Sequence, residues 1–433
     1  MKILVVGGGG REHAIIRTFR REQAGLDIYC APGGVGMAPL ASNLPIPVND
    51  VDRLVEAADR HGIELVIVGP ELPLALGLAD RLRAHGHPVL GPGAAAARIE
   101  SSKAFAKEVM RAAGVPTAAW AVFRDLNEAL AHVDGHAEPL VVKASGLAAG
   151  KGAVVCATRA EARAAVTRML GEHAFGEAGD EVVIESFLPG EELSVFAVTN
   201  GREMSLLPAA QDYKRVGEGD TGPNTGGMGA CSPVSFATPD LMARVEREIL
   251  RPTLAELEKR DARFRGILYA GLMIAPDGSP SVIEFNCRLG DPEAQTVLPT
   301  LEGDFLLACQ AAATSGRIPE LPATGRFAVT TVLAARGYPE SPHLGDHVTL
   351  PSNQGRDAIF FHAGTTRDPA GGFMTAGGRV AACTGLGDTF EEARANSLRL
   401  ADGTQFEGKH FRRDIGWREA ERQGAGAGAP ETP

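Results

Sequence analysis

Short apolar runs alternate with amphipathic stretches over the first hundred residues. The runs KILVVG, LDIYCAP, ELVIVGP and HPVLGP are brief and mostly end at glycine or proline, which is typical of buried strands. The stretches EHAIIRTFRR and VDRLVEAADRHG between them have apolar residues at helical spacing. Strands that alternate with helices in this way predict an open parallel sheet, and therefore a Rossmann-like N-terminal domain.

The pattern changes near residue 101. SSKAFAKEVMRAAGVP predicts a helix with a serine cap and a glycine stop, and PLVVKASG and GAVVCAT predict two short strands joined by a glycine-rich turn. A later strand, RFAVTTVLAARGYP, and the helix TFEEARANSLRLAD predict a small α+β unit. We therefore predict a multidomain chain of α/β and α+β class. Its predicted parts are an N-terminal domain (1–100), a middle domain (101–324) with a mobile lid (about 117–190), a C-terminal domain (325–420) and a disordered tail (421–433).

Composition and net charge exclude several classes of function. The formal charge of −11 argues against a general nucleic-acid binder, so a site for an anionic ligand needs lysines and arginines gathered locally. The six cysteines are scattered without a CxxC pair, which fits a reducing cytosol. No apolar stretch approaches the ~18 residues of a membrane span, and the apolar run at the N-terminus is too short for a signal peptide. We predict a cytoplasmic protein without nucleic-acid or membrane partners.

KASGLAAGKG has the composition of a phosphate-binding P-loop but lacks two of its parts. Ser145 stands where the first glycine belongs, and Gly152 stands where a P-loop has its metal-binding hydroxyl. A P-loop also leads from a strand into a helix, whereas this turn joins two predicted strands. The segment is predicted to be a hairpin flap that carries lysines.

The first strand ends in a second glycine-rich turn, GGGGREH. Glu12 replaces the third glycine of a dinucleotide fingerprint, and the second strand ends in CAPG, without the acid that holds an NAD ribose. Two interpretations remain, a tight strand-to-helix turn or an anion site at the start of a helix, and we favour the second. Glu71 ends another strand on the same edge of the sheet.

SVIEFNCRLGDPE carries the strongest chemical signal. Side chains alternate along a strand, so one face is expected to hold Val282, Glu284, Asn286 and Arg288, and the other Ile283, Phe285 and Cys287. The polar row is either the wet side of an edge strand or a pair of oxygen ligands for Mg²⁺ followed by an arginine for a phosphoryl group. The segment AQDYKRVGEGDTGPNTGGMGACSP is expected to be a long functional loop, because it is rich in glycine and has no periodicity.

These residues together resemble a known family. A lysine at a helix start, a lysine before a glycine-rich hairpin, a Glu-rich turn and a late Glu-x-Asn strand occur in this order in ATP-grasp enzymes. More narrowly, the chain resembles the glycinamide ribonucleotide synthetase family over nearly its whole length, in GGREHA, VGPE, KASGLAAGKG, QDYKR, DTGPNTGGMGA, YAGLM, IEFNCRLGDPE, FHAGT, GGRV and RRDIGWR. It departs at Gly8, where the family commonly has asparagine.

The resemblance implies a set of site residues. ATP would be bound by Lys103, Lys143, the flap residues Gly146, Gly150, Lys151 and Gly152, the adenine-binding Glu185, Phe187 and Leu188, and the ribose-binding Glu192. Mg²⁺ or Mn²⁺ would be bound by Glu284 and Asn286, with Arg288 and Lys151 in catalytic roles. Phosphoribosylamine is placed at Gly9, Gly10, Arg11 and Glu12, facing Glu71, with Asp212 and Asp291 orienting the substrate amines.

The implied reaction joins glycine to 5-phosphoribosylamine through a glycyl phosphate, with ATP consumed, in de novo purine biosynthesis. Its partners would be these small molecules, and the protein a monomer or homodimer. Another ATP-grasp carboxylate–amine ligase is the nearer alternative, and a nicotinamide-dependent oxidoreductase or nucleotide sensor is the farther one. The missing acid after the second strand argues against NAD, and a sensor would not need Glu284 and Asn286 arranged for a metal.

Overall fold

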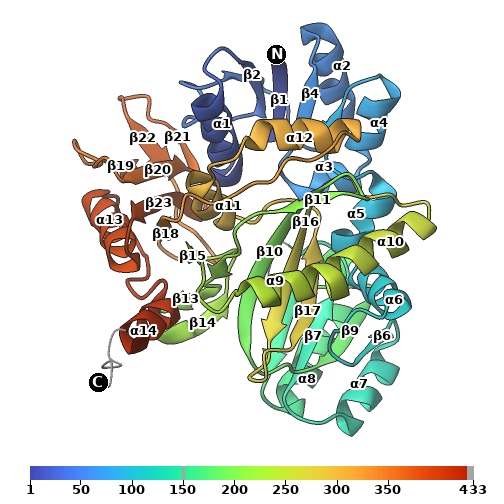
Figure 1. Ribbon diagram of the computed structural model, residues 1–433. Coiled ribbons are helices and arrows are strands. Elements are labelled where there is room, and N and C mark those ends of the chain that lie inside the picture. Colours follow the sequence, from blue (N-terminus) through green and yellow to red (C-terminus); the bar gives the residue numbers. More distant parts are fainter. Residues whose placement is uncertain (149–151, 427–433) are drawn as a thin grey trace, which may run out of the picture.

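The computed structural model describes residues 1–148 and 152–426 of the 433-residue chain. Figure 1 shows three parts, with the N-terminal part and the middle part stacked on one side and the C-terminal part beside them. Within the described ranges, no helix has the length and apolar character needed to span a bilayer. The arrangement matters because the three parts share one cavity, described below.

The N-terminal part is a parallel sheet with strand order β3-β2-β1-β4-β5, which confirms the predicted open sheet. β1 is completely buried in its centre, as its continuous apolar run requires. Helix α12, which comes much later in the chain, also covers this sheet, with Phe305 stacked on Phe19 at 5.9 Å. The elements are β1 (Lys2–Gly7), α1 (Gly10–Glu22), β2 (Asp27–Pro32), β3 (Ser42–Asn43), α2 (Val51–His61), β4 (Leu65–Val68), α3 (Glu71–Ala75), α4 (Leu78–Ala84), β5 (Val89–Leu90), α5 (Ala94–Ser101) and α12 (Phe305–Thr314).

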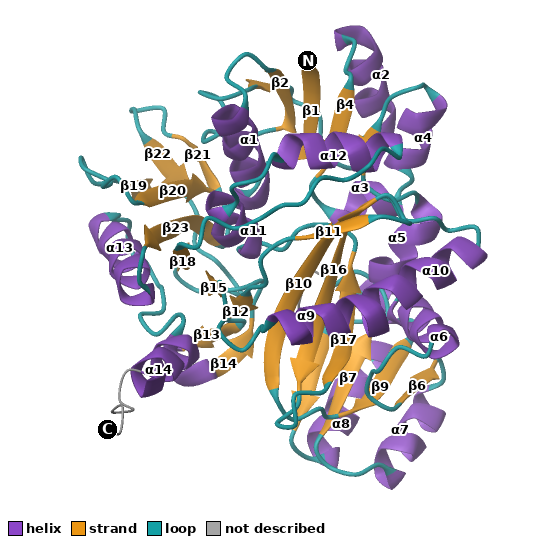
Figure 2. Ribbon diagram, viewed as in Figure 1, coloured by secondary structure: helices purple, strands orange, loops and turns teal. Residues whose placement is uncertain are grey.

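The middle part contains two antiparallel sheets, visible as separate layers in Figure 2. The larger has the order β11-β10-β16-β17, and the smaller, β6-β9-β7-β8, has a hydrophobic core of its own with α7 and α8. The elements are α6 (Lys103–Ala113), β6 (Trp120–Phe123), α7 (Leu126–Gly135), β7 (Leu140–Ala144), β8 (Ala153–Cys156), α8 (Arg159–Val166), β9 (Val182–Ser186), β10 (Glu191–Thr199), β11 (Met204–Leu206), α9 (Pro239–Val245), α10 (Arg251–Lys259), β16 (Gly266–Ile274) and β17 (Pro280–Asn286).

The C-terminal part is built on a sheet with the order β12-β15-β18-β23-β20, covered by α13. A smaller sheet, β19-β22-β21, lies beside it. The elements are β12 (Gln211–Asp212), β13 (Arg215–Gly217), β14 (Thr221–Asn224), β15 (Gly229–Ser232), α11 (Glu293–Val297), β18 (Phe327–Ala334), β19 (His347–Val348), β20 (Ala358–His362), β21 (Thr365–Arg367), β22 (Phe373–Thr375), β23 (Arg379–Gly387), α13 (Phe390–Gly403) and α14 (Trp417–Gly426).

The structure corrects three expectations. The segment expected as a long loop forms the four short strands β12 to β15, and two of them join the C-terminal sheet because β15 pairs with β18. The strict alternation expected along β17 fails, since a register shift opposite Gly271 sends Val282 into the core and leaves Ile283 lining the cavity. The predicted tail is helical over 421–426, as the end of α14, while 427–433 lie outside the described residues.

Candidate active site

A cavity of about 490 Å³ lies where the three parts meet. Arg11 and Glu71 line it from the N-terminal part, Lys143 and Glu284 from the middle part, and Arg379 from the C-terminal part. Its volume is in the range of small-molecule sites.

Two lysines of the middle part pair with one buried carboxylate, and a third lysine lies near them. Ser102 caps α6 by accepting a hydrogen bond from the Phe105 N–H, so Lys103 and Lys107 lie one turn apart on the same face. The Lys107 Nζ is 3.1 Å from Glu185 Oε2, and the Lys143 Nζ of β7 is 3.0 Å from Oε1. Lys103 donates to the carbonyl of Gly146, at the start of the flap. Burial lowers the pKa of Lys107 to about 8, although Glu185 acts in the opposite direction.

Glu284 and Asn286 sit at the end of β17, and both reach the cavity. Burial alone would raise the pKa of Glu284, but Lys214, Lys143 and Lys103 hold it below its usual range, so the group is a carboxylate at neutral pH. Glu284 has no hydrogen-bond or ion-pair partner within the described ranges, and the Asn286 Oδ1 accepts from Arg288 at 3.1 Å.

No group of three or more His, Cys, Asp or Glu side chains suited to a metal occurs in the described residues. Two protein oxygens are nevertheless a usual protein share for Mg²⁺, which keeps waters and phosphate oxygens as its other ligands. The chemistry of Glu284 and Asn286 therefore fits a nucleotide-bound divalent cation.

Arg288 lines the cavity and also connects the middle part to the N-terminal part. Its guanidinium forms ion pairs with Glu71 at 3.2 Å and with Glu100 at 2.6 Å. Glu100 in turn accepts from the backbone N–H of Cys287 at 2.8 Å. Burial would lower the pKa of Arg288, but the two carboxylates raise it, so it stays charged. The arginine expected to clamp a phosphoryl group already has two carboxylate partners.

Several hydrogen-bond donors at the start of α1 already have partners within the protein. The Gly9 N–H donates to Glu12 at 2.7 Å, and the Arg11 guanidinium donates to Glu12 at 2.6 Å and to the carbonyl of Leu289 at 3.1 Å. The Asp291 carboxylate lies at this helix start. Burial would raise its pKa, but the charges of Arg379 and Arg11 hold the pKa below its usual range, and the backbone N–H of Arg11 contributes to the lowering. An aspartate thus stands where the sequence analysis placed a phosphate.

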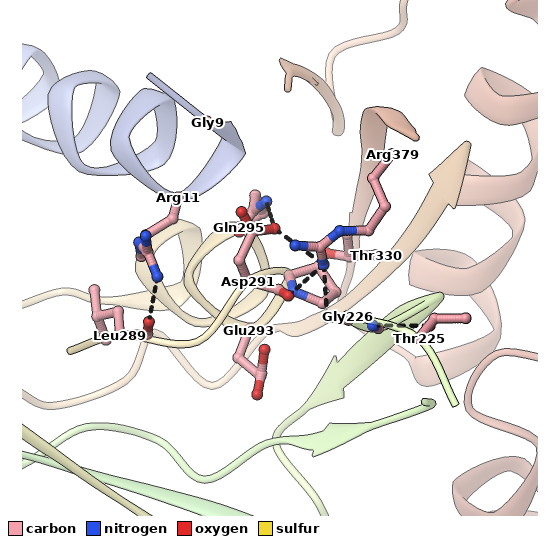
Figure 3. Close-up of polar contacts among 12 residues, drawn as sticks. Gly9, Arg11, Thr225, Gly226, Leu289, Asp291, Glu293, Gln295, Thr330 and Arg379 are labelled. Atoms are coloured by element: carbon pink, nitrogen blue, oxygen red, sulfur yellow. Dashed lines mark hydrogen bonds and ion pairs between the residues drawn. The ribbon is translucent and has the colours of Figure 1, made fainter. Parts of the chain in front are cut away.

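Figure 3 shows how the C-terminal part reaches the same point. Arg379 of β23 donates to the carbonyls of Gly226 and Asp291, and its guanidinium is 3.5 Å from the Asp291 carboxylate. Gln295 donates to the same carboxylate oxygen, Oδ1, at 2.8 Å. Asp291 therefore connects all three parts of the molecule.

The remaining charged group lies between β10 and β12. The Lys214 Nζ forms ion pairs with Glu192 and, at 3.2 Å, with Asp212. Burial raises the pKa of Asp212 to about 7, although Lys214 lowers it. Asp212 therefore titrates close to neutral pH.

The cavity brings most of the predicted site residues together. Those on its wall are Arg11, Glu71, Lys103, Lys143, Gly152, Glu185, Phe187, Leu188, Glu192, Asp212, Glu284, Asn286, Arg288 and Asp291. Gly9, Gly10, Glu12 and Gly146 are outside its lining, and Gly150 and Lys151 are outside the described residues. The sequence analysis missed Glu100, Lys107, Tyr269, Glu293 and Arg379, all of which line the cavity. Only Lys107 had a usable local signal, its one-turn spacing from Lys103 on a predicted helix.

Comparison with known proteins places the chain in a family. The phosphoribosylglycinamide synthetase models match residues 1–100 (N domain), 101–294 (ATP-grasp domain) and 328–418 (C domain). Phosphoribosylamine–glycine ligases of Ralstonia nicotianae and Chlorobaculum tepidum are each 44% identical, covering 98% and 96% of this chain and 100% and 99% of their own lengths.

Solved structures agree with this placement. The phosphoribosylamine–glycine ligase of Thermotoga maritima has a TM-score of 0.83 and 35% identity, over 96% of this chain and 100% of its own. A Campylobacter jejuni biotin carboxylase–β-γ-ATP complex has a TM-score of 0.73 at 15% identity, over 96% of this chain and 93% of its own, which shows a shared fold alone. The chain belongs to the phosphoribosylglycinamide synthetase family.

Proposed function

We propose that this protein joins glycine to 5-phosphoribosylamine, with ATP converted to ADP and phosphate, and so forms glycinamide ribonucleotide in purine biosynthesis. The observation that carries the proposal is full-length membership of a family whose relatives bear that ligase name. A cavity with clustered lysines and two metal-type ligands supports it. The nearer alternative, another carboxylate–amine pair, has no comparable support.

The middle part supplies the nucleotide site in this proposal. Lys103 and Lys143 neutralise the ATP phosphates, and the flap from Gly146 to Gly152, which includes Gly150 and Lys151, closes over them. Glu185, with the backbone near Phe187 and Leu188, holds adenine, and Glu192 holds the ribose hydroxyls. Glu284 and Asn286 hold Mg²⁺ or Mn²⁺, which supplies positive charge to the phosphates when bound.

The chemistry needs no protein nucleophile. A carboxylate oxygen of glycine attacks the γ-phosphorus, the bond to the β,γ-bridging oxygen breaks, and ADP leaves. The amine of phosphoribosylamine then attacks the acyl carbon, the bond to phosphate breaks, and the amine gives up a proton. Positioning and charge neutralisation account for such transfers. Arg288 stabilises the transferred group in this scheme, and the closed flap, including Lys151, keeps water from the acyl phosphate.

The phosphoribosylamine is placed between the N-terminal and C-terminal parts. Arg11, at the start of α1 beside Gly9, Gly10 and Glu12, lies on the cavity wall with Glu71, and Asp291 orients the amine. We further infer a cytoplasmic monomer or homodimer that acts on small molecules. The six cysteines, all of them within the described ranges, are buried and free, which fits a reducing compartment.

An ADP-release assay tests the function. With ATP, Mg²⁺, glycine and freshly made phosphoribosylamine, we expect ADP release to require every component and the product mass to be that of glycinamide ribonucleotide. Replacing glycine by alanine or serine should abolish release. Faster turnover with another carboxylate or another amine would assign the chain to a different ATP-grasp ligase activity.

A further inference from the structure

Glu293 is a buried carboxylate that the proposed roles leave unused. It begins α11, the residue is 4% exposed, and it lines the cavity. Its Oε1 accepts a hydrogen bond from the Tyr269 hydroxyl at 2.8 Å. Its Oε2 has no hydrogen-bond or ion-pair partner within the described ranges. In Figure 3 the carboxylate points away from Asp291, Gln295 and Arg379.

The nearby cations are already paired. Arg288 is held by Glu71 and Glu100, and Lys214 is held by Glu192 and Asp212. None of the described lysines or arginines forms an ion pair with Glu293. A buried carboxylate without a cation is unfavourable, because desolvation penalises its charge. A cationic group brought by a ligand would remove that penalty.

A second acidic group lies in the same cavity. Asp212 has a raised pKa, chiefly because it is buried, and the charge of Glu293 adds to that increase. Tyr269 of β16 connects strand β10 with helix α11, since its hydroxyl contacts Ser194 at 2.9 Å as well as Glu293 at 2.8 Å. The wall between β10, β12 and α11 is therefore electronegative and suited to an ammonium group.

Resting on the proposed function, we propose that Glu293 binds the α-ammonium group of glycine and that Tyr269 is the residue that positions it. The two substrates both carry nitrogen, but they need opposite protonation states. The amine of phosphoribosylamine must be neutral to attack the acyl carbon, and an unpaired carboxylate beside it would favour the unreactive ammonium. Asp291, the carboxylate proposed to orient that amine, is already paired with Arg379 and Gln295. The glycine nitrogen takes no part in bond formation, so it stays charged through both steps.

This assignment also explains how one nitrogen is kept from reacting. An ammonium group held by a buried carboxylate has no free electron pair, so the nitrogen of the activated glycine cannot itself act as a nucleophile. The glycine carboxylate would extend from Glu293 towards the phosphate-binding side of the same cavity, where Glu284 and Asn286 lie.

The Glu293→Gln variant tests the proposal. Glutamine keeps the volume and an oxygen that accepts from Tyr269, but it removes the charge. We expect the KM for glycine to rise at least tenfold, while the KM values for ATP and phosphoribosylamine stay within twofold. Selectivity for glycine over glycolate, which has a hydroxyl in place of the ammonium, should fall in parallel. Tyr269→Phe should raise the glycine KM by a smaller factor, because the carboxylate remains but loses its positioning contact.

Glu419→Gln is the matched control, since Glu419 is also fully buried but contacts Ser235 and Arg422 outside the cavity. It should leave the glycine KM unchanged. A change in the phosphoribosylamine KM alone in Glu293→Gln, or unchanged kinetics, would overturn the assignment. If Glu293→Gln does not fold, an unchanged glycine KM in Tyr269→Phe would overturn the assignment. Failure of the wild-type protein to form the product would instead contradict the proposed function.

Discussion

The two sides of the cavity use different cations in different ways. On the proposed nucleotide side, Lys103, Lys107 and Lys143 come from neighbouring elements of one part, and Lys107 and Lys143 pair with a single glutamate, Glu185. On the opposite side, arginines bind carboxylates and carbonyls from other parts of the molecule, such as Arg11 with Leu289, 278 residues away.

The difference separates cations that can exchange their protein partner for a ligand from cations that are held in fixed contacts within the fold. A lysine ammonium is a compact charge that can change partner, whereas the forked guanidinium of arginine forms several fixed hydrogen bonds at once. We therefore expect substitutions on the lysine side to change nucleotide affinity and turnover. Substitutions on the arginine side should first change stability.

The largest expected effect is on the nucleotide side, at Glu284. Glu284→Gln keeps the volume but removes the charge of a group that has no partner among the described residues, so kcat should fall by about 100- to 1000-fold. ADP release under saturating substrates measures this. The melting temperature should stay close to that of the wild type, and a strongly lowered melting temperature would mean that Glu284 is structural.

The arginine side should respond in the opposite way. Arg288→Ala leaves Glu100 buried without its cation, so the free energy of unfolding should fall by about 3 kcal/mol. Urea denaturation measures the loss. The double variant Arg288→Ala, Glu100→Gln should regain part of the stability, because the uncompensated charge is then gone. Equal stability of the single variant and the wild type would contradict the interdomain role.

Lys107 tests whether the lysine group acts together. Lys107→Met keeps the length of the side chain but leaves Glu185 with Lys143 as its cation, so we expect the KM for ATP to rise roughly tenfold, about 1.4 kcal/mol of binding free energy. Steady-state kinetics at varied ATP gives the value. Glu108→Gln, a change at the exposed neighbour that pairs with Arg111, is the control and should leave the KM unchanged.

The smallest effect concerns pH. Asp212 has a raised pKa of about 7, so it is charged above pH 7 and becomes neutral as the pH falls. Glycine keeps its ammonium over this range, and its KM should therefore rise by roughly threefold between pH 8 and pH 6. In Asp212→Asn the KM should be higher and independent of pH. A glycine KM with the same pH profile in both proteins would remove Asp212 from the amine site.

The sequence by itself determined the alternation of strands and helices in the N-terminal part and the antiparallel pair of strands β7 and β8 around a glycine-rich turn. It also determined the helix α6, from its Ser102 cap to the glycine after Ala113, and the placement of Glu284 and Asn286 at a strand end. These features depend on residues a few positions apart, so apolar periodicity, caps and turns are enough to specify them.

Tertiary structure alone decided which charged side chains are available to bind a ligand. The register shift in β17, the pairing of β15 with β18, and the contact of Arg379 with Asp291, 88 residues away, leave no periodic signal in the chain. The same is true of Glu293, which differs from other glutamates only in what surrounds it after folding. Burial and pairing determine whether a charge serves the fold or a ligand, and both come from segments that meet only in the folded protein.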